Sequence, residues 1–366
     1  MEPEQFQVER RLAGGERLVL AGEIAGQGPP VVLLHGLSAT RRNVVQGSRA
    51  LLKRDYRLIA YDARGHGASS PAPSYGYPDL IEDLEAVLAE LEVERAAFVG
   101  SSMGAATGMA FALRHPQRAA AVVQITPAYN GQGRTGNVDG GAWDAMATGL
   151  ETGGVDAFVE VAQPGGAGEG WKRIAREAVR QRMERHEDPL EVAKALRSMP
   201  RSTAWDGLEA LRDVEVPVLI VASRDEMDHL HPLAIAEEYA RLLPNAELVV
   251  EEEGKSPLAW QGARLSNVIA DFFMRIERAA KRPVSMVPLP MIIFASGAQT
   301  YSETLPLREN RACDPATNQW MAPGGRAAVS GPISVALLTR AVPDTVIVDG
   351  PPKRMLPFRP TRRFRK

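Results

Sequence analysis

The stretch Ala96-Ala97-Phe98-Val99-Gly100-Ser101-Ser102-Met103-Gly104 decides the fold. Its first half is an apolar run typical of a buried strand, and its second half opens a run rich in Ala and Met that is typical of a helix. Gly100 and Gly104 flank Ser102 in the pattern G-x-S-x-G, and glycine permits the tight turn that this pattern requires. The pattern predicts a strained turn between strand and helix that exposes the Ser102 oxygen as a nucleophile.

On both sides of this stretch, short apolar runs alternate with amphipathic runs from Phe6 to about Arg278. The runs at 31–34 and 218–221 are continuously apolar, which is typical of parallel strands that helices cover on both faces. The sequence therefore predicts an α/β fold with a mostly parallel, eight-stranded sheet and helices on both faces. The expected strands lie at 6–9, 17–21, 31–35, 57–61, 96–100, 120–125, 218–222 and 247–250, and the expected helices at 40–53, 78–91, 102–114, 232–243 and 260–278.

The alternation stops between residues 129 and 211, where Gly-rich stretches surround helical runs. We expect this region to form a helical cap inserted into a core made of residues 6–128 and 212–280. Residues 281–366 are rich in Pro, Gly and Arg and have no sustained period. This composition predicts a disordered or poorly ordered C-terminal tail.

Two further motifs follow predicted strands, His35-Gly36-Leu37 and Asp62-Ala63-Arg64-Gly65-His66-Gly67. Together with the stretch around Ser102 they resemble the α/β-hydrolase superfamily, in the branch that carries a helical cap. The resemblance implies that the backbone N–H groups of Leu37 and Met103 form an oxyanion hole, which stabilises charge that appears in the transition state. His35 and His66 are expected to be structural loop residues rather than bases.

The resemblance also implies an acid after the strand at 218–222 and a histidine base after the strand at 247–250. Asp225 is the expected acid, and Asp228 is its rival because Pro232 follows it at a spacing common in the family. The histidine position lies in Glu253-Gly254-Lys255-Ser256-Pro257, where this chain has Lys255. That departure bears on catalysis and not on the fold.

Three interpretations of Lys255 stay open. In the first, Lys255 is the base, which requires its pKa to fall from an ordinary value of about 10.4 to roughly 7–8 so that it can accept a proton. In the second, His231 on the loop after the acid strand is the base. In the third, the catalytic set is incomplete, and Lys255 is a surface residue or pairs with the acidic run at 251–253.

The composition is that of an ordinary globular protein, with 45% hydrophobic and 24% charged residues. A net charge of −2 favours neither nucleic acid nor an anionic membrane as partner. Neither a signal peptide nor a membrane span is readable, so a cytoplasmic location is expected, with the oligomeric state open. Ligand spacings for a metal or an organic cofactor are absent from the sequence, and we expect neither.

The expected function is hydrolysis of a small or medium acyl ester, lactone or related carbonyl substrate. Ser102 would act through an acyl-enzyme, supported by Asp225 and by one of the two candidate bases, His231 or Lys255. The alternative is a catalytically impaired homologue that binds a small molecule as a sensor or pseudo-enzyme.

Overall fold

The computed structural model describes residues 2–132, 137–162, 169–224, 228, 230–281, 313–314 and 319–320. The chain divides into two compact units, Met1–Ser285 and Met286–Lys366. The described residues of the second unit form one short antiparallel pair, β9 (Cys313–Asp314) with β10 (Gln319–Trp320). Apart from these residues and Lys281, the predicted tail at 281–366 lies outside the described residues, and its disorder stays a prediction.

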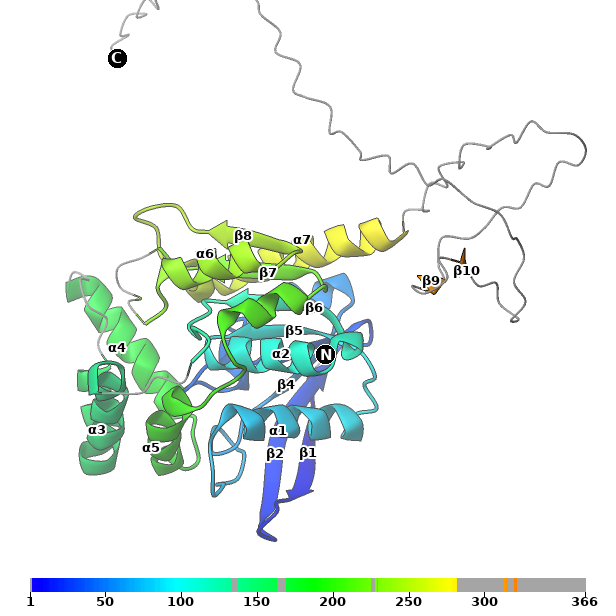
Figure 1. Ribbon diagram of the computed structural model, residues 1–366. Coiled ribbons are helices and arrows are strands. Elements are labelled where there is room, and N and C mark those ends of the chain that lie inside the picture. Colours follow the sequence, from blue (N-terminus) through cyan, green and yellow to red (C-terminus); the bar gives the residue numbers. More distant parts are fainter. Residues whose placement is uncertain are drawn as a thin grey trace, which may run out of the picture. The chain divides into compact units, whose positions relative to one another are not determined.

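The first unit is built on an eight-stranded sheet in the order β1-β2-β4-β3-β5-β6-β7-β8 (Figure 1). The pairs β1–β2 and β2–β4 are antiparallel, and every pair from β4 to β8 is parallel. The predicted eight-stranded, mostly parallel sheet is thereby confirmed. The strands are β1 (Glu4–Arg11), β2 (Arg17–Ala25), β3 (Pro30–Leu34), β4 (Arg57–Tyr61), β5 (Ala96–Ser101), β6 (Ala119–Ile125), β7 (Val218–Ala222) and β8 (Ala246–Val250).

Helices cover both faces of this sheet. Alternate strand residues point to opposite faces, so Val32 and Phe98 belong to one apolar core, and Val31 and Val99 to another. The first core is closed by α1 (Tyr77–Glu90), α2 (Met103–Arg114) and α6 (Leu233–Leu242), and the second by α7 (Gly262–Lys281).

The predicted helix at 40–53 is wrong. The segment contains only two short 3₁₀ turns, Arg41–Asn43 and Leu52–Arg54. Between them Gln46 and Gly47 have φ angles of 49° and 70°, in the left-handed region, which no right-handed helix can include. The apolar residues of the segment pack into the core on the α7 side, and this packing produces the spacing that favoured a helix.

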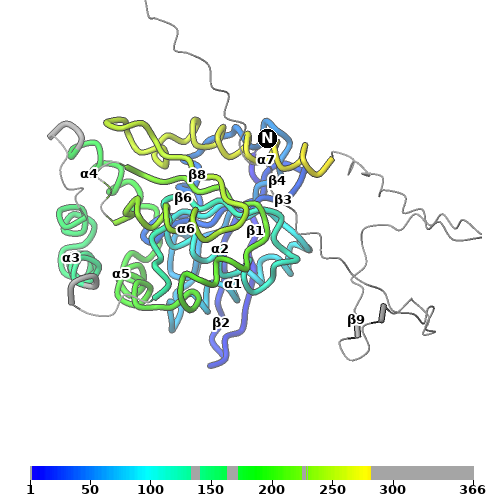
Figure 2. The backbone as a smooth tube through the Cα atoms, turned by 45° about the horizontal axis from the view of Figure 1, so that its top comes forward, coloured from blue at the N-terminus to red at the C-terminus, as the bar shows by residue number. Residues whose placement is uncertain are grey.

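The described residues between β6 and β7 include three helical elements, the first of them kinked at Gly154, that lie together on one side of the sheet (Figures 1 and 2). They are α3 (Asn137–Val161), α4 (Glu169–Met183) and α5 (Pro189–Ser198). They share a small apolar core of their own around Leu150, Phe158 and Met183. Helices thus make up much of the described part of 129–211, although its Gly-rich composition gave no prediction of α3, and its role as a cap stays a prediction.

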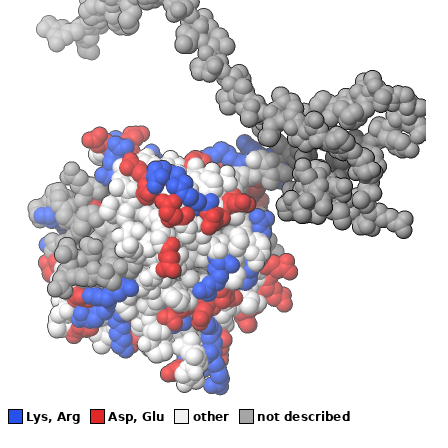
Figure 3. All heavy atoms as spheres, viewed as in Figure 1, with Lys and Arg blue, Asp and Glu red and all other residues white. Residues whose placement is uncertain are grey.

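None of the described helices is both long and apolar enough to cross a lipid bilayer. The face shown in Figure 3 carries basic and acidic side chains that are interspersed, without one large patch of a single sign.

Candidate active site

Ser102 lies between β5 and α2 with φ 49° and ψ −107°, a backbone conformation that L-residues rarely adopt. Its own N–H donates to the Ile125 carbonyl at 3.0 Å, which holds the turn against β6. A Cβ built on Gly100 would overlap the Gly104 backbone, and one built on Gly104 would overlap the Leu34 carbonyl. Both glycines are therefore needed for close approach, and the predicted strained turn at Ser102 is present.

The loop after β3 passes directly over this turn. A Cβ built on Gly36 would lie 3.6 Å from the Ser102 Cβ, so Leu37 is placed beside the serine. Met103 is the first residue of α2, where backbone N–H groups lack an acceptor within the helix. Within the described part of the chain, no hydrogen bond uses the N–H of Leu37 or of Met103. Both donors are available to a ligand next to Ser102.

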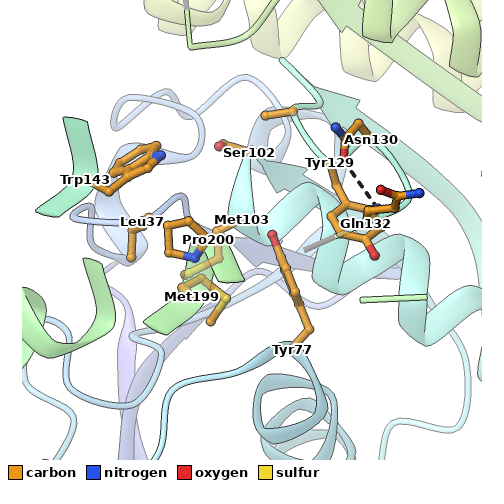
Figure 4. Close-up of a pocket in the computed structure, with 11 residues that line it drawn as sticks. Leu37, Tyr77, Ser102, Met103, Tyr129, Asn130, Gln132, Trp143, Met199 and Pro200 are labelled. Atoms are coloured by element: carbon orange, nitrogen blue, oxygen red, sulfur yellow. Dashed lines mark hydrogen bonds between the residues drawn. The ribbon is translucent and has the colours of Figure 1, made fainter. Parts of the chain in front are cut away.

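A pocket opens at Ser102 and encloses about 500 Å³ of empty space, the open solvent at its mouth included. In Figure 4 Trp143 and Met199 lie on one side, and Tyr129 and Gln132 lie on the other. Its described lining is mostly apolar, and its polar side chains are uncharged. The lining residues are Leu37, Tyr77, Ser102, Met103, Ala128, Tyr129, Asn130, Gln132, Trp143, Met199 and Pro200.

The loop after β7 contains a carboxylate–imidazole pair. The Asp228 Oδ1 lies 2.5 Å from the His231 Nδ1, and the His231 N–H donates to the Asp228 carbonyl at 3.1 Å. The two side chains are 10% and 18% exposed, which partly protects their interaction from water. Asp225, the predicted acid, lies outside the described residues.

Lys255 follows β8 in a turn where its N–H donates to the Glu252 carbonyl at 3.1 Å. Its side chain is exposed and, among the residues that the structure describes, makes no hydrogen bond or ion pair. Of the two alternatives in the third interpretation, these residues show Lys255 at the surface and not paired with the acidic run. Glu251 is instead buried, where it accepts a hydrogen bond from the Arg224 N–H and one from the Ser223 hydroxyl.

Ser102, His231 and Lys255 share one edge of the sheet because each follows the carboxyl end of a parallel strand. Neighbouring strands lie about 4.8 Å apart, so β5 is roughly 10 Å from β7 and roughly 14 Å from β8. The described lining of the pocket includes neither His231 nor Lys255. The edge thus brings the candidate residues to one side of the molecule without joining them in one hydrogen-bonded set.

His35 and His66 are structural, as predicted. The His35 Nε2 accepts from the Ala63 N–H at 2.9 Å and its Nδ1 donates to the Gly36 carbonyl at 2.8 Å. A third buried histidine, His186 between α4 and α5, lies against them with its ring centroid 5.6 Å from that of His66. No motif in the sequence singles out His186, and only the structure reveals its place.

A family model described as alpha/beta hydrolase fold matches residues 29–149. A thermophilic esterase from Thermogutta terrifontis has a similar structure, with a TM-score of 0.62 and 22% identity over 75% of this chain and 99% of that one. By its strand order and these matches, the chain has the α/β-hydrolase fold.

Two curated relatives match over shorter regions. An sn-1-specific diacylglycerol lipase of Xenopus laevis is 35% identical over 99 residues, which are 27% of this chain and 32% of that protein. Epoxide hydrolase B of Mycobacterium tuberculosis is 38% identical over 113 residues, 30% of this chain and 32% of that protein. The chain spans about half or less of the length of the curated relatives that it matches.

Proposed function

We propose that this protein is a serine-dependent hydrolase that cleaves a small or medium acyl ester, lactone or related carbonyl compound. The main observation behind this proposal is the position of Ser102. In its strained turn it lines a pocket, next to the N–H groups of Leu37 and Met103, which no described residue uses. The relatives named as a lipase, an epoxide hydrolase and an esterase support hydrolysis as the class of reaction.

The proposed reaction has two halves. The Ser102 Oγ attacks the carbonyl carbon, its proton passes to the base, and the developing oxyanion accepts hydrogen bonds from Leu37 and Met103. The alcohol then leaves with the proton from the base, and the acyl group stays on Ser102. Water, deprotonated by the same base, releases the acid and restores the serine.

His231 is our candidate for the base, oriented by Asp228. A carboxylate that accepts from Nδ1 leaves Nε2 as the atom that takes the serine proton, and it stabilises the imidazolium that forms. This assignment requires the loop after β7 to bring Nε2 within hydrogen-bond distance of Ser102 in the working complex. Lys255 is the weaker candidate because an exposed lysine lacks the desolvation that favours its neutral form.

The lining of the pocket favours substrates in which the group next to the scissile carbonyl is uncharged. Its described wall offers apolar side chains and the neutral polar groups of Tyr77, Asn130 and Gln132, but no charged side chain. A carboxylate or ammonium bound there would lose hydration without gaining an opposite charge from this wall.

One observation favours the second candidate function, a catalytically impaired homologue that binds a small molecule. No described residue that lines the pocket is a histidine, lysine or carboxylate, so no base touches the pocket in the described part of the chain. Such a protein would still bind carbonyl compounds at Leu37 and Met103.

Labelling with a fluorophosphonate probe, located by mass spectrometry, separates the two functions. We expect stoichiometric labelling at Ser102, none in Ser102→Ala, and a rate reduced about 10³-fold or more in His231→Gln. Absence of labelling in the folded wild-type protein would contradict the hydrolase and favour the binding protein. Normal labelling of His231→Gln would reject His231 as the base while keeping Ser102 as nucleophile.

A further inference from the structure

We propose that His186 is a positioning residue through which the cap holds the turn that presents the Leu37 N–H to the oxyanion. This inference rests on the proposed function, because it gives Leu37 a role in catalysis. The His186 Nε2 donates to the carbonyl of Ser38, the residue directly after Leu37, at 3.3 Å.

The turn that carries Leu37 is strained. It spans Gly36 to Ala39 and is closed by the hydrogen bond from the Ala39 N–H to the Gly36 carbonyl at 3.0 Å. Ser38 occupies its third position with φ 61°, where a turn of this kind ordinarily has glycine or asparagine. A non-glycine residue in this region is strained and persists only where its surroundings hold it.

Two histidines hold both backbone groups of Ser38. Its N–H donates to the His66 Nε2 at 3.4 Å, and its carbonyl accepts from His186. The His66 ring is fixed in turn because its Nδ1 donates to the Arg64 carbonyl at 2.9 Å. Both rings are buried, so water does not readily replace these bonds.

His186 is itself attached to the core by a reciprocal pair of bonds. The Gly67 N–H donates to the His186 Nδ1 at 2.8 Å, and the Glu187 N–H donates to the Gly67 carbonyl at 2.9 Å. Acceptance at Nδ1 leaves the proton on Nε2, the atom that faces Ser38. Leu37 also packs against both the first sheet core and the small core of the cap. The cap and the turn are therefore joined by polar and apolar contacts at the same place.

This arrangement requires a neutral imidazole at position 186. A second proton would sit on Nδ1 and face the Gly67 N–H, so the bond to Gly67 would be lost. The charged and titratable groups around the ring are His35, His66, Asp62 and Arg182. Only Asp62 among them favours the protonated form, and burial opposes it.

The test compares His186→Leu with Tyr75→Phe. Tyr75 also links core to cap, through a hydrogen bond from its hydroxyl to Glu191 of α5, but it does not touch Ser38. Hydrogen exchange of residues 35–40 is measured by mass spectrometry, and kcat and KM are measured with p-nitrophenyl acetate. We expect His186→Leu to speed exchange in this segment and to lower kcat about 10-fold with KM within about 2-fold, less than the loss of a whole donor.

Two further variants separate positioning from general loosening of the cap. His186→Gln offers an amide that can donate to Ser38 and accept from Gly67, so it should recover most of the lost kcat. Ser38→Gly added to His186→Leu should also recover kcat, because glycine adopts a positive φ without support.

The proposal is overturned if Tyr75→Phe changes loop exchange and kcat as much as His186→Leu does, or if His186→Leu leaves loop exchange unchanged. If the wild-type protein neither hydrolyses the ester nor labels at Ser102, the proposed function fails. The exchange comparison then still decides whether His186 holds the turn.

Discussion

The carboxylate of Asp228 and the imidazole of His231 lie 2.5 Å apart within one loop after β7. A second hydrogen bond, from the His231 N–H to the Asp228 carbonyl, also holds the two residues in one turn. Among the described residues, Asp228 is thus the carboxylate that contacts the candidate base. This relationship makes the rival Asp228, rather than Asp225, the acid to test first.

Asp228→Asn should lower kcat by about 10²–10⁴, because an amide neither stabilises the imidazolium nor fixes its tautomer. Asp225→Asn is the matched control and should change kcat by less than about 3-fold. Steady-state hydrolysis of a p-nitrophenyl ester measures both. If Asp225→Asn gives the large loss and Asp228→Asn does not, the sequence-based assignment of Asp225 is right.

Lys255→Met should leave kcat within about 2-fold of the wild-type value, as is usual for an exposed side chain, because Lys255 pairs with none of the residues that the structure describes. A Lys255 base would instead make the variant inactive and would make wild-type activity rise through alkaline pH. The pH–rate profile of both proteins between pH 6 and about 10 distinguishes these cases.

Stability should fall on acidification because of His186. Burial lowers its pKa from 6.5 to about 4, with His35 and Arg182 acting in the same direction. The folded state then binds fewer protons than the unfolded state between these values. Stability is therefore unaffected by this group above pH 6.5 and falls as pH drops through 6.5, and the loss reaches about 3 kcal/mol near pH 4.

Urea unfolding of the wild type and of His186→Gln at pH 7.5, 5.5 and about 4.5 checks this. The difference in unfolding free energy between the two proteins should shrink as pH falls, because glutamine does not titrate. A difference that is constant over this range would mean that His186 titrates normally in the folded protein. Burial also lowers the pKa values of His35 and His66, so the variant should keep part of the acid sensitivity.

The buried pair of Arg64 with Asp83 ties the loop after β4 to α1. The Arg64 Nε and Nη2 donate to the two Asp83 oxygens at 2.7 and 2.9 Å, and both side chains are at most 1% exposed. Arg64→Met should destabilise the protein by about 3 kcal/mol, because it leaves a buried carboxylate short of one partner. Arg17→Met breaks the exposed pair with Glu9 and should leave the free energy of unfolding nearly unchanged, because water screens this pair.

Thermal or urea unfolding of both variants compares the two pairs directly. A small effect of Arg64→Met would mean that Arg10, which also donates to Asp83, fully compensates.

The sheet was predictable because its signals are local. Continuously apolar runs such as 218–221 specify buried parallel strands, and Gly100 and Gly104 around Ser102 specify a strained turn at one point of the chain. The prediction of a helix at 40–53 was wrong because the spacing of apolar residues indicates only which residues are buried. It does not report the positive φ angles of Gln46 and Gly47.

The site was only partly predictable because its contacts join distant segments. Leu37 lies beside Ser102 because β3 and β5, the strands that precede them, are neighbours in the sheet. The motifs after these two strands imply this strand order. The bond from His186 to Ser38 spans 148 residues, and nothing near His186 in the sequence indicates it. The pairing of Asp228 with His231 has a local spacing, but many loops contain an Asp and a His three residues apart without pairing them.

Gly104→Ala should destabilise the protein by about 3 kcal/mol or more and remove labelling at Ser102. The added Cβ would overlap the Leu34 carbonyl, and its nearest neighbours are backbone atoms that cannot rotate away. Gly141→Ala in α3 is the matched control, because a Cβ there meets no atom within 4 Å and alanine favours helix by about 0.5–1 kcal/mol. Urea unfolding and probe labelling are measured on both. A Gly104→Ala protein as stable and as reactive as Gly141→Ala would mean that α2 can move away from β3, and that Ser102 does not depend on this close approach.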